Sequence, residues 1–260
     1  MDVVRSAKRS VSVVGLFVFW FVLATIGPET LPGPTTVAAA FVGKVQDPVY
    51  WDAIVLSTLR VLGPFVVAAL IAVPLGLLIG WNVVFGDFTF PALELLRPIP
   101  PIAWGPFGIL VFPTLTISLG FIGFQVTTTV VFITFLGAFF PILLNAIEGV
   151  RGINDEYSRA AESLGAADWQ TFRHVIYPGA LPSVHTGMVV GIGLAWVNLV
   201  AAEMISGGGL GFMTWSAYTS GSYPVIFVGI ITIGVLGYLS STVVRYLGTS
   251  QLAWVDDTTA

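Results

Sequence analysis

The chain has 260 residues, of which 56% are hydrophobic and only 9% are charged. A water-soluble domain carries about 25% charged residues, so this chain has too few to cover a water-facing surface, and lipid must form part of its surroundings. It contains no cysteine and two histidines, which excludes disulfides and thiolate metal sites and predicts neither a metal cluster nor a cofactor.

The charge balance is unusual for a membrane protein. The net charge is -4 and the isoelectric point is about 5.0. Two explanations stay open: a salt-loving source, where acidic surfaces are common, or chance among few charged residues.

Uncharged runs predict where the chain crosses the membrane, because about 20 apolar residues span a bilayer. The first run follows basic residues as in a signal peptide, but it shows no small-x-small cleavage site, and we expect a retained helix. Residues 29–52 predict an external loop with a short interfacial helix at 35–45, and residues 204–223, rich in Gly and Ser, an irregular external segment. Six membrane helices are expected, one each in 10–28, 61–86, 174–202 and 224–244 and two within 98–147, with a break near 118–124.

Basic residues predict the orientation, because cytoplasmic loops carry an excess of Lys and Arg. With the N terminus inside, six spans put eight of the ten basic residues in the cytoplasm and leave Lys44 and Arg60 outside. The C terminus then also lies in the cytoplasm. The same arrangement makes residues 149–181 a cytoplasmic loop.

That loop, 149–181, is a polar island in an apolar chain. Its acidic residues, Glu156 among them, favour a helix N-terminus, and a short helix from about 157 to 164 places Ala160 and Ala161 near one face. Small side chains allow such a helix to lie in a groove of a partner, and Gly165 permits a turn with positive φ. Asp168 is expected to cap a second helix over 169–175, and Pro178 and Pro182 to redirect the chain into the membrane. The alternative is an ordinary amphipathic loop.

A second segment, residues 96–106, has four prolines at the start of a span, which forbid a regular helix there. Irregular backbone at membrane depth is tolerated only where it is buried in protein or lines a cavity. The segment is therefore predicted to face a translocation path or a helix interface, unless the prolines only mark a helix start. The candidates for the path are Pro98, Pro100, Pro101 and Trp104.

Four further polar residues are candidates for the path or its gate. Gln125, Trp196 and Asn198 lie within predicted spans, where helix–helix hydrogen bonding is the alternative role. Glu203 ends the fifth predicted span and is either a gate or docking residue or an interfacial carboxylate. No basic residue lies within a predicted span, so no anion site can be named.

The order of these motifs resembles the permease subunits of ABC importers. In that family a cytoplasmic coupling loop opens Glu-Ala-Ala. Here Arg159 replaces the Glu, while Ala160, Ala161, Gly165, Val175 and Pro178 keep the family's spacing. Together with residues 96–106, 137–143, 201–204 and 207–211, the loop resembles the nitrate, sulfonate, taurine and bicarbonate branch over roughly residues 50–255. The resemblance implies an all-α integral membrane protein with the type I ABC importer permease fold.

The resemblance also implies partners: two copies of an ATP-binding subunit, a second permease in a homodimer and an external substrate-binding protein, with no nucleic acid involved. The chain itself has no phosphate-binding Gly-Lys-Ser/Thr loop and no catalytic set, so we expect ATP hydrolysis in a separate chain and no enzyme here.

A single permease domain covers 1–260, with the first helix and external loop in 1–50 and the core in 51–255. The expected cargo is a small anion; a vitamin precursor and a secondary transporter are the alternatives.

Overall fold

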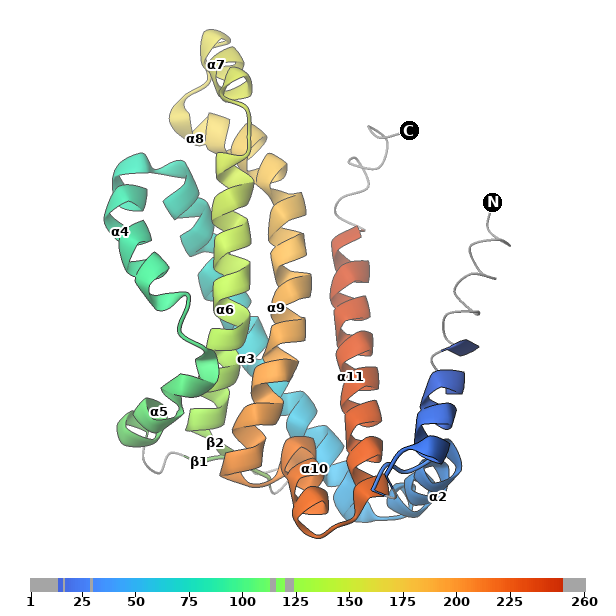
Figure 1. Ribbon diagram of the computed structural model, residues 1–260. Helices are drawn as coiled ribbons and strands as arrows, with labels where there is room; N and C mark the ends of the chain where they lie inside the picture. The colour runs from blue at the N-terminus through green and yellow to red at the C-terminus, as the bar shows by residue number, and fades with distance from the viewer. Residues whose placement is uncertain (1–13, 16, 29, 113–115, 120–123, 250–260) are drawn as a thin grey trace.

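The computed structural model describes residues 14–15, 17–28, 30–112, 116–119 and 124–249. Within these ranges the chain is almost entirely helical, with one pair of short strands (Figure 1). Four helical stretches in this part are long and apolar enough to cross a membrane: α3 (Pro48–Trp81), α6 (Thr128–Arg151), the run that ends in α9 (Tyr177–Ser206) and α11 (Tyr223–Thr249). The predicted all-α membrane fold is confirmed.

Shorter elements connect the long helices. They are α2 (Pro34–Val45), α4 (Val83–Leu96), a 3-10 turn at Pro101–Trp104, α5 (Gly105–Val111), β1 (Thr116–Leu119), β2 (Phe124–Thr127), α7 (Asp155–Ser163), α8 (Asp168–Thr171), a π-helical turn at Phe172–Ile176 and α10 (Gly209–Thr219). The two strands pair antiparallel, with Thr116 opposite Thr127.

Local sequence sets several helix starts. Pro34 and Pro48 occupy first turns, where a missing N–H costs nothing. The side chain of Asp47 accepts a hydrogen bond from the N–H of Val49 at 3.0 Å, and that of Asn82 accepts one from Phe85 at 2.9 Å. Each side chain satisfies a backbone donor that the first helical turn leaves open.

The core lies between α3, α6 and α9, which run side by side (Figure 1). Small residues let these helices approach closely, as is typical in membranes. A Cβ atom added at Gly76 of α3 would come within 2.6 Å of Cβ of Ala146 on α6, so the two backbones meet there. Gly80 of α3 makes a similar close approach to Val150 of α6. Outside the core, α11 leaves apolar side chains such as Tyr238 and Leu239 exposed, as a lipid-facing helix does.

The molecule has two distinct ends. Helices α7 and α8 project at one end, beyond α6 and α9, and α2, α10 and the β1–β2 pair lie at the other (Figure 1). The long helices run between these ends.

Several sequence expectations need correction. The second span begins at Pro48 rather than at residue 61, so Arg60 lies inside α3 and not in an external loop. Residues 204–223 are not irregular, because they contain α10, whose Leu210 and Gly211 are buried. Gln125 lies in β2 rather than in a membrane helix.

The number of membrane spans stays a prediction. Two apolar helices, Phe17–Ile26 and Pro101–Val111, stand where the first and third spans were expected, and both are shorter than a bilayer requires. The short helix expected at 35–45 is confirmed as α2. The break expected near 118–124 falls at the strand pair.

Close packing at Gly76 predicts how substitutions in α3 affect the thermal stability of the protein. Gly76→Ala should lower the thermal midpoint of the purified protein in detergent, because the added methyl group overpacks the α3–α6 contact at a cost of about 1–3 kcal/mol. Gly63→Ala is the matched control, since it lies in the same helix and a Cβ there meets nothing within 4 Å. Equal midpoints for the two variants would contradict the observed packing.

Candidate functional site

The loop between α6 and α9 begins with the predicted short helix, α7. Its N-terminus is capped by Asn154, whose side-chain oxygen accepts a hydrogen bond from the N–H of Glu156 at 3.0 Å. Its C-terminus closes at Gly165, which has the predicted positive φ of 86°. The N–H of Ala166 bonds to the carbonyl of Ala161 at 3.0 Å and that of Gly165 to Glu162 at 2.8 Å, the pattern of a Schellman motif. The helix is thus stopped at both ends by its own sequence.

Apolar residues on and just after α7 are exposed and do not pack against the bundle. Leu164 is 89% exposed, and Tyr157 and Ala160 are exposed beside it. Ala161 is half-buried. Arg159, at the position where the permease family has a Glu, is also exposed and lies 3.8 Å from Asp155 on the same helix, a pair that contributes little in water.

The chain from α8 into α9 is one uninterrupted helical run, Asp168–Ser206. Asp168 is therefore not the predicted cap: Ala167 holds that position, and its N–H donates to Oε1 of Gln170 at 2.9 Å. Pro178 lies in the first turn of α9 and Pro182 inside it, so neither redirects the chain as expected. The π-helical turn that contains the half-buried Val175 precedes Pro178, which has no N–H for a regular turn.

Aromatic rings fasten this loop to the bundle. The centroid of the Phe172 ring lies 4.7 Å from that of Trp81 at the end of α3. The ring of Trp169 stacks on the Phe172 ring, with the two centroids 5.4 Å apart. Such aromatic pairs contribute about 0.5–1.5 kcal/mol of stability beyond the free energy of burying their surface. These ring contacts connect the loop to α3 as well as to α9.

The proline-rich segment is irregular, as predicted. Pro98 and Pro100 are exposed in the turn after α4, and Pro101 opens a 3-10 turn that ends at Trp104. Trp104 is half-buried, and within the described residues its Nε1 has no hydrogen-bond partner. Pro101 and Asn198 line the same pocket of about 410 Å³, so the structure brings two path candidates together.

Trp196 and Asn198, the two polar candidates on α9, are both hydrogen-bonded. Trp196 is buried, and its Nε1 donates to Oγ of Ser240 on α11 at 2.9 Å. Asn198 donates to the carbonyl of Leu194 in its own helix at 2.8 Å. Trp196 therefore makes the helix–helix bond that was the alternative to a place in the path.

Glu203 forms the most highly connected polar site in the described structure. It is fully buried, and its carboxylate accepts hydrogen bonds from Oγ of Ser57 at 2.9 Å, from Nη1 of Arg60 at 3.1 Å and from the N–H of Gly211 at 2.9 Å. Arg60 is only 2% exposed and donates also to the carbonyl of Gly208 at 3.2 Å. We call this set the Glu203 cluster; it joins α3, α9 and α10.

The Glu203 cluster needs glycine beside it. Residues 207–209 are three glycines with positive φ, which turn the chain from α9 into α10. A Cβ at Gly209 would overlap the carboxylate of Glu203. The Gly-rich sequence after Glu203 thus allows the backbone to approach the charge, which the expectation of an irregular segment missed.

Arg60 and Ser57 were not predicted as site residues. Charged residues were taken to mark the ends of spans, which placed Arg60 in a loop. Ser57 and Arg60 are three residues apart and share one face of a mostly apolar helix. That spacing was the available signal, and the partner 143 positions away gave none.

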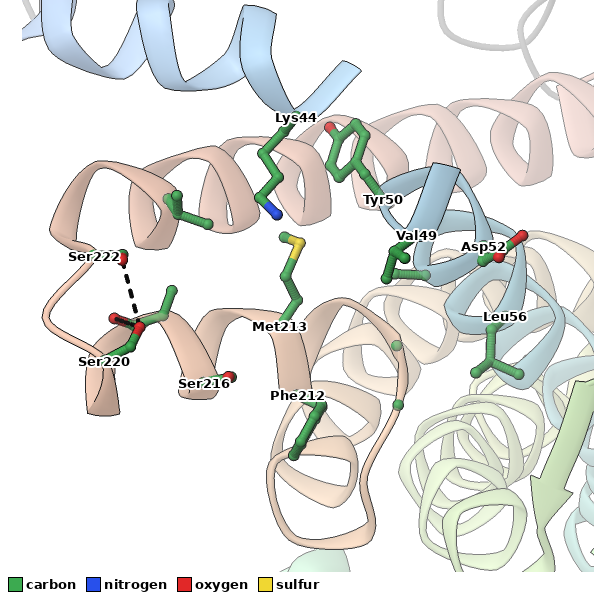
Figure 2. A pocket seen from close by; sticks show the side chains of 15 residues that line it. Lys44, Val49, Tyr50, Asp52, Leu56, Phe212, Met213, Ser216, Ser220 and Ser222 are labelled. Carbon is green, nitrogen blue, oxygen red and sulfur yellow. Dashed lines mark hydrogen bonds between the residues drawn. The ribbon is translucent and has the colours of Figure 1, made fainter. Parts of the chain in front are cut away.

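A pocket of about 580 Å³ opens at the end that carries α2 and α10. Figure 2 shows Lys44, from the end of α2, pointing toward Met213 on α10, with Tyr50 of α3 beside them. Lys44 pairs with Asp47 at 3.0 Å, and this pair lowers the pKa of the Asp47 carboxyl. The hydroxyl of Tyr50 bonds to that of Thr232 on α11 at 2.6 Å.

Comparison with known proteins identifies the family. Residues 72–251 match the family of binding-protein-dependent transport system inner membrane components. The chain belongs to this family.

Its relatives include permeases with named cargo. The chain is 37% identical to a putative ABC transporter permease of Methanocaldococcus jannaschii, over 78% of this chain and 73% of the relative. It is 30% identical to the nitrate import permease NrtB of Synechocystis (92% and 87%) and 32% identical to the taurine transport permease TauC of Escherichia coli (92% and 86%). The family and these names place the chain in a membrane and imply an ATPase and a binding protein as partners.

The buried ion pair between Arg60 and Glu203 leads to a second prediction. Arg60→Met and Glu203→Gln should each lower the thermal midpoint strongly, because each leaves one desolvated charge uncompensated, at a cost of about 3–5 kcal/mol. The double variant should be more stable than either single one. Thermal unfolding in detergent of the three variants measures this coupling.

The half-buried pair Lys44–Asp47 is the control, since Asp47→Asn keeps the α3 cap and Lys44→Met removes the cation. Its coupling should be below about 1 kcal/mol. Additive effects of Arg60→Met and Glu203→Gln would show that the two side chains do not depend on each other.

Proposed function

We propose that this chain is the permease subunit of an ATP-driven importer for a small oxyanion. Relatives that carry nitrate and taurine support this cargo class, and a vitamin precursor has no such support. One structural observation carries the coupling role: a self-capped helix, α7, stands exposed at one end of the bundle and leads through Gly165 into the run that becomes α9.

In this proposal α7 lies in a groove of the ATPase. Ala160 and Leu164 provide a small and an apolar contact, and Glu156 and Arg159 provide charges at the edge. Gly165 fixes the angle between α7 and α8. Val175 and Pro178 belong to the π-helical and first α9 turns that pass the motion on.

Movement of the ATPase then becomes movement of α9. Because α9 packs on α6 and α3 along the core, a tilt at the α7 end changes how the three helices meet. An ATP-driven change of this kind is a shift between two states, each favoured by different contacts of the partner. The chain transmits force in this cycle.

The proposed assembly has two permease copies and two ATPases, with one permease domain per chain over 1–260. The α7 end and both chain termini face the cytoplasm, and the external binding protein meets the end that carries α2 and α10. The pocket between α2, α3 and α10 opens at that end, which supports it as the entrance.

Orientation can be tested without background, because the chain has no cysteine. Leu164→Cys on the α7 loop should react with a membrane-impermeant maleimide only in inverted vesicles. Thr219→Cys, exposed at the end of α10, should react only in right-side-out cells. Labelling of both positions from the same side would refute the proposed orientation.

Coupling is tested by Leu164→Asp. This side chain is 89% exposed, so the charge should leave folding unchanged but weaken an apolar contact with the ATPase. Co-purification of the ATPase and substrate uptake in proteoliposomes should both fall by about tenfold or more, as expected for a buried interface anchor. Thr219→Asp adds the same charge at the opposite end and should retain the ATPase. Full ATPase retention by Leu164→Asp would exclude α7 as the docking helix.

A further inference from the structure

A cationic side chain, that of Arg97, lines the pocket shared by Pro101 and Asn198. The pocket lies where residues 97–101 cross α6 and α9. The structure points to a binding site for the transported oxyanion in this pocket, with the Arg97 guanidinium as its principal ligand. This inference rests on the proposed function, and nothing in the family match assigns it.

The depth of the pocket supports a place on the path. Its lining on α6 runs from Leu136 to Glu148, which at 1.5 Å per residue is roughly 18 Å of a membrane-crossing helix. Arg97 lines the same pocket with an exposed side chain, although it was predicted to lie in a cytoplasmic loop. A cation beside a membrane-crossing helix is costly unless it is paired or faces a water-filled cavity, and such residues mark ion or substrate pathways.

Arg97 has its donors available. Within the described residues its side chain makes no ion pair and no hydrogen bond. Two arginines elsewhere in the bundle are engaged: Arg60 is bonded to Glu203, and Arg151 lies 4.6 Å over the ring of Phe90. The guanidinium of Arg97 can therefore present its N–H groups to a ligand in the pocket.

Two amides add donors. Asn145 uses one N–H for the carbonyl of Pro141 at 2.8 Å, and Asn198 uses one for Leu194. Each amide nitrogen carries a second hydrogen that can reach a ligand. Gly137 makes room for Asn198, since a Cβ there would lie 2.6 Å from its amide nitrogen. The site thus combines a cation with neutral donors.

This chemistry suits an oxyanion. The flat fork of a guanidinium pairs with two oxygens of a nitrate, bicarbonate or sulfonate group. Glu148 lines the same pocket and lowers its positive potential. Weak binding is what a transport path requires, because the ion must leave again. The phosphate of a lipid headgroup offers the same oxygens and is the competing source of ligand.

Uptake by the complete importer tests the site. Proteoliposomes with permease, ATPase and binding protein should import anion about tenfold more slowly with Arg97→Gln, because a charge-assisted hydrogen bond is lost. Arg97→Lys should keep part of the rate. Arg245→Gln removes the same charge from the exposed face of α11 and should match the wild type. If Arg97→Gln also matches the wild type, the inference is wrong.

A second measurement keeps Arg97 intact. In the complete importer, Leu144→Cys places a thiol in the pocket of a chain that has no other cysteine. An anionic methanethiosulfonate should react there faster than a cationic one, and nitrate should slow the reaction. Protection by anionic lipid but not by nitrate would overturn the inference in favour of a lipid headgroup. Failure of the wild-type importer to carry any oxyanion would instead refute the proposed function.

Discussion

The buried carboxylate of Glu203 is the constraint on which one end of the fold depends. A desolvated charge must be compensated where it lies, and the compensating donors come from Ser57 and Arg60 on α3 and from the backbone of α10. Separation of these elements would leave two charges uncompensated where water is scarce. The carboxylate therefore fixes α3, α9 and α10 relative to one another, and the glycines at 207–209 allow the backbone to come close enough. Glycine allows many backbone conformations, and the contacts around Glu203 hold these three glycines in one of them.

The helical run from Asp168 to Ser206 connects this fixed end to the exposed α7 loop. At 1.5 Å per residue its 39 residues extend roughly 58 Å, more than the thickness of a bilayer. Pro182 and the π-helical turn lie near the α7 end. From Ile176 onward this run is buried repeatedly against α3 and α6, first at Ile176 and Ala180. In the proposed cycle, a displacement of the loop tilts the whole helix, and the Glu203 cluster carries this tilt into α3 and α10.

Local signals predicted local structure well. The short helix at 35–45, the turn at Gly165 and the irregular backbone after Arg97 each depend on residues within a few positions, and the structure confirms all three. Long-range contacts account for the errors. Arg60 was assigned to a loop because its partner Glu203 is 143 residues away, and α10 was missed because its first turn is stabilised by that same carboxylate and by Ser57. A rule that ends spans at charges works only where charges reach water, and a buried pair breaks it.

The position of Asn198 explains how coupling and cargo can be linked. It lies five residues before Glu203 on α9, little more than one turn, so the proposed anion pocket and the Glu203 cluster share one stretch of helix. Arg97 stands across the pocket on a segment that follows α4 rather than on α9. A tilt of α9 therefore changes the distance between the amide of Asn198 and the guanidinium of Arg97 while the cluster holds α9 to α3. In the proposed cycle, the ATPase would weaken or strengthen the anion site by moving one wall of the pocket relative to the other.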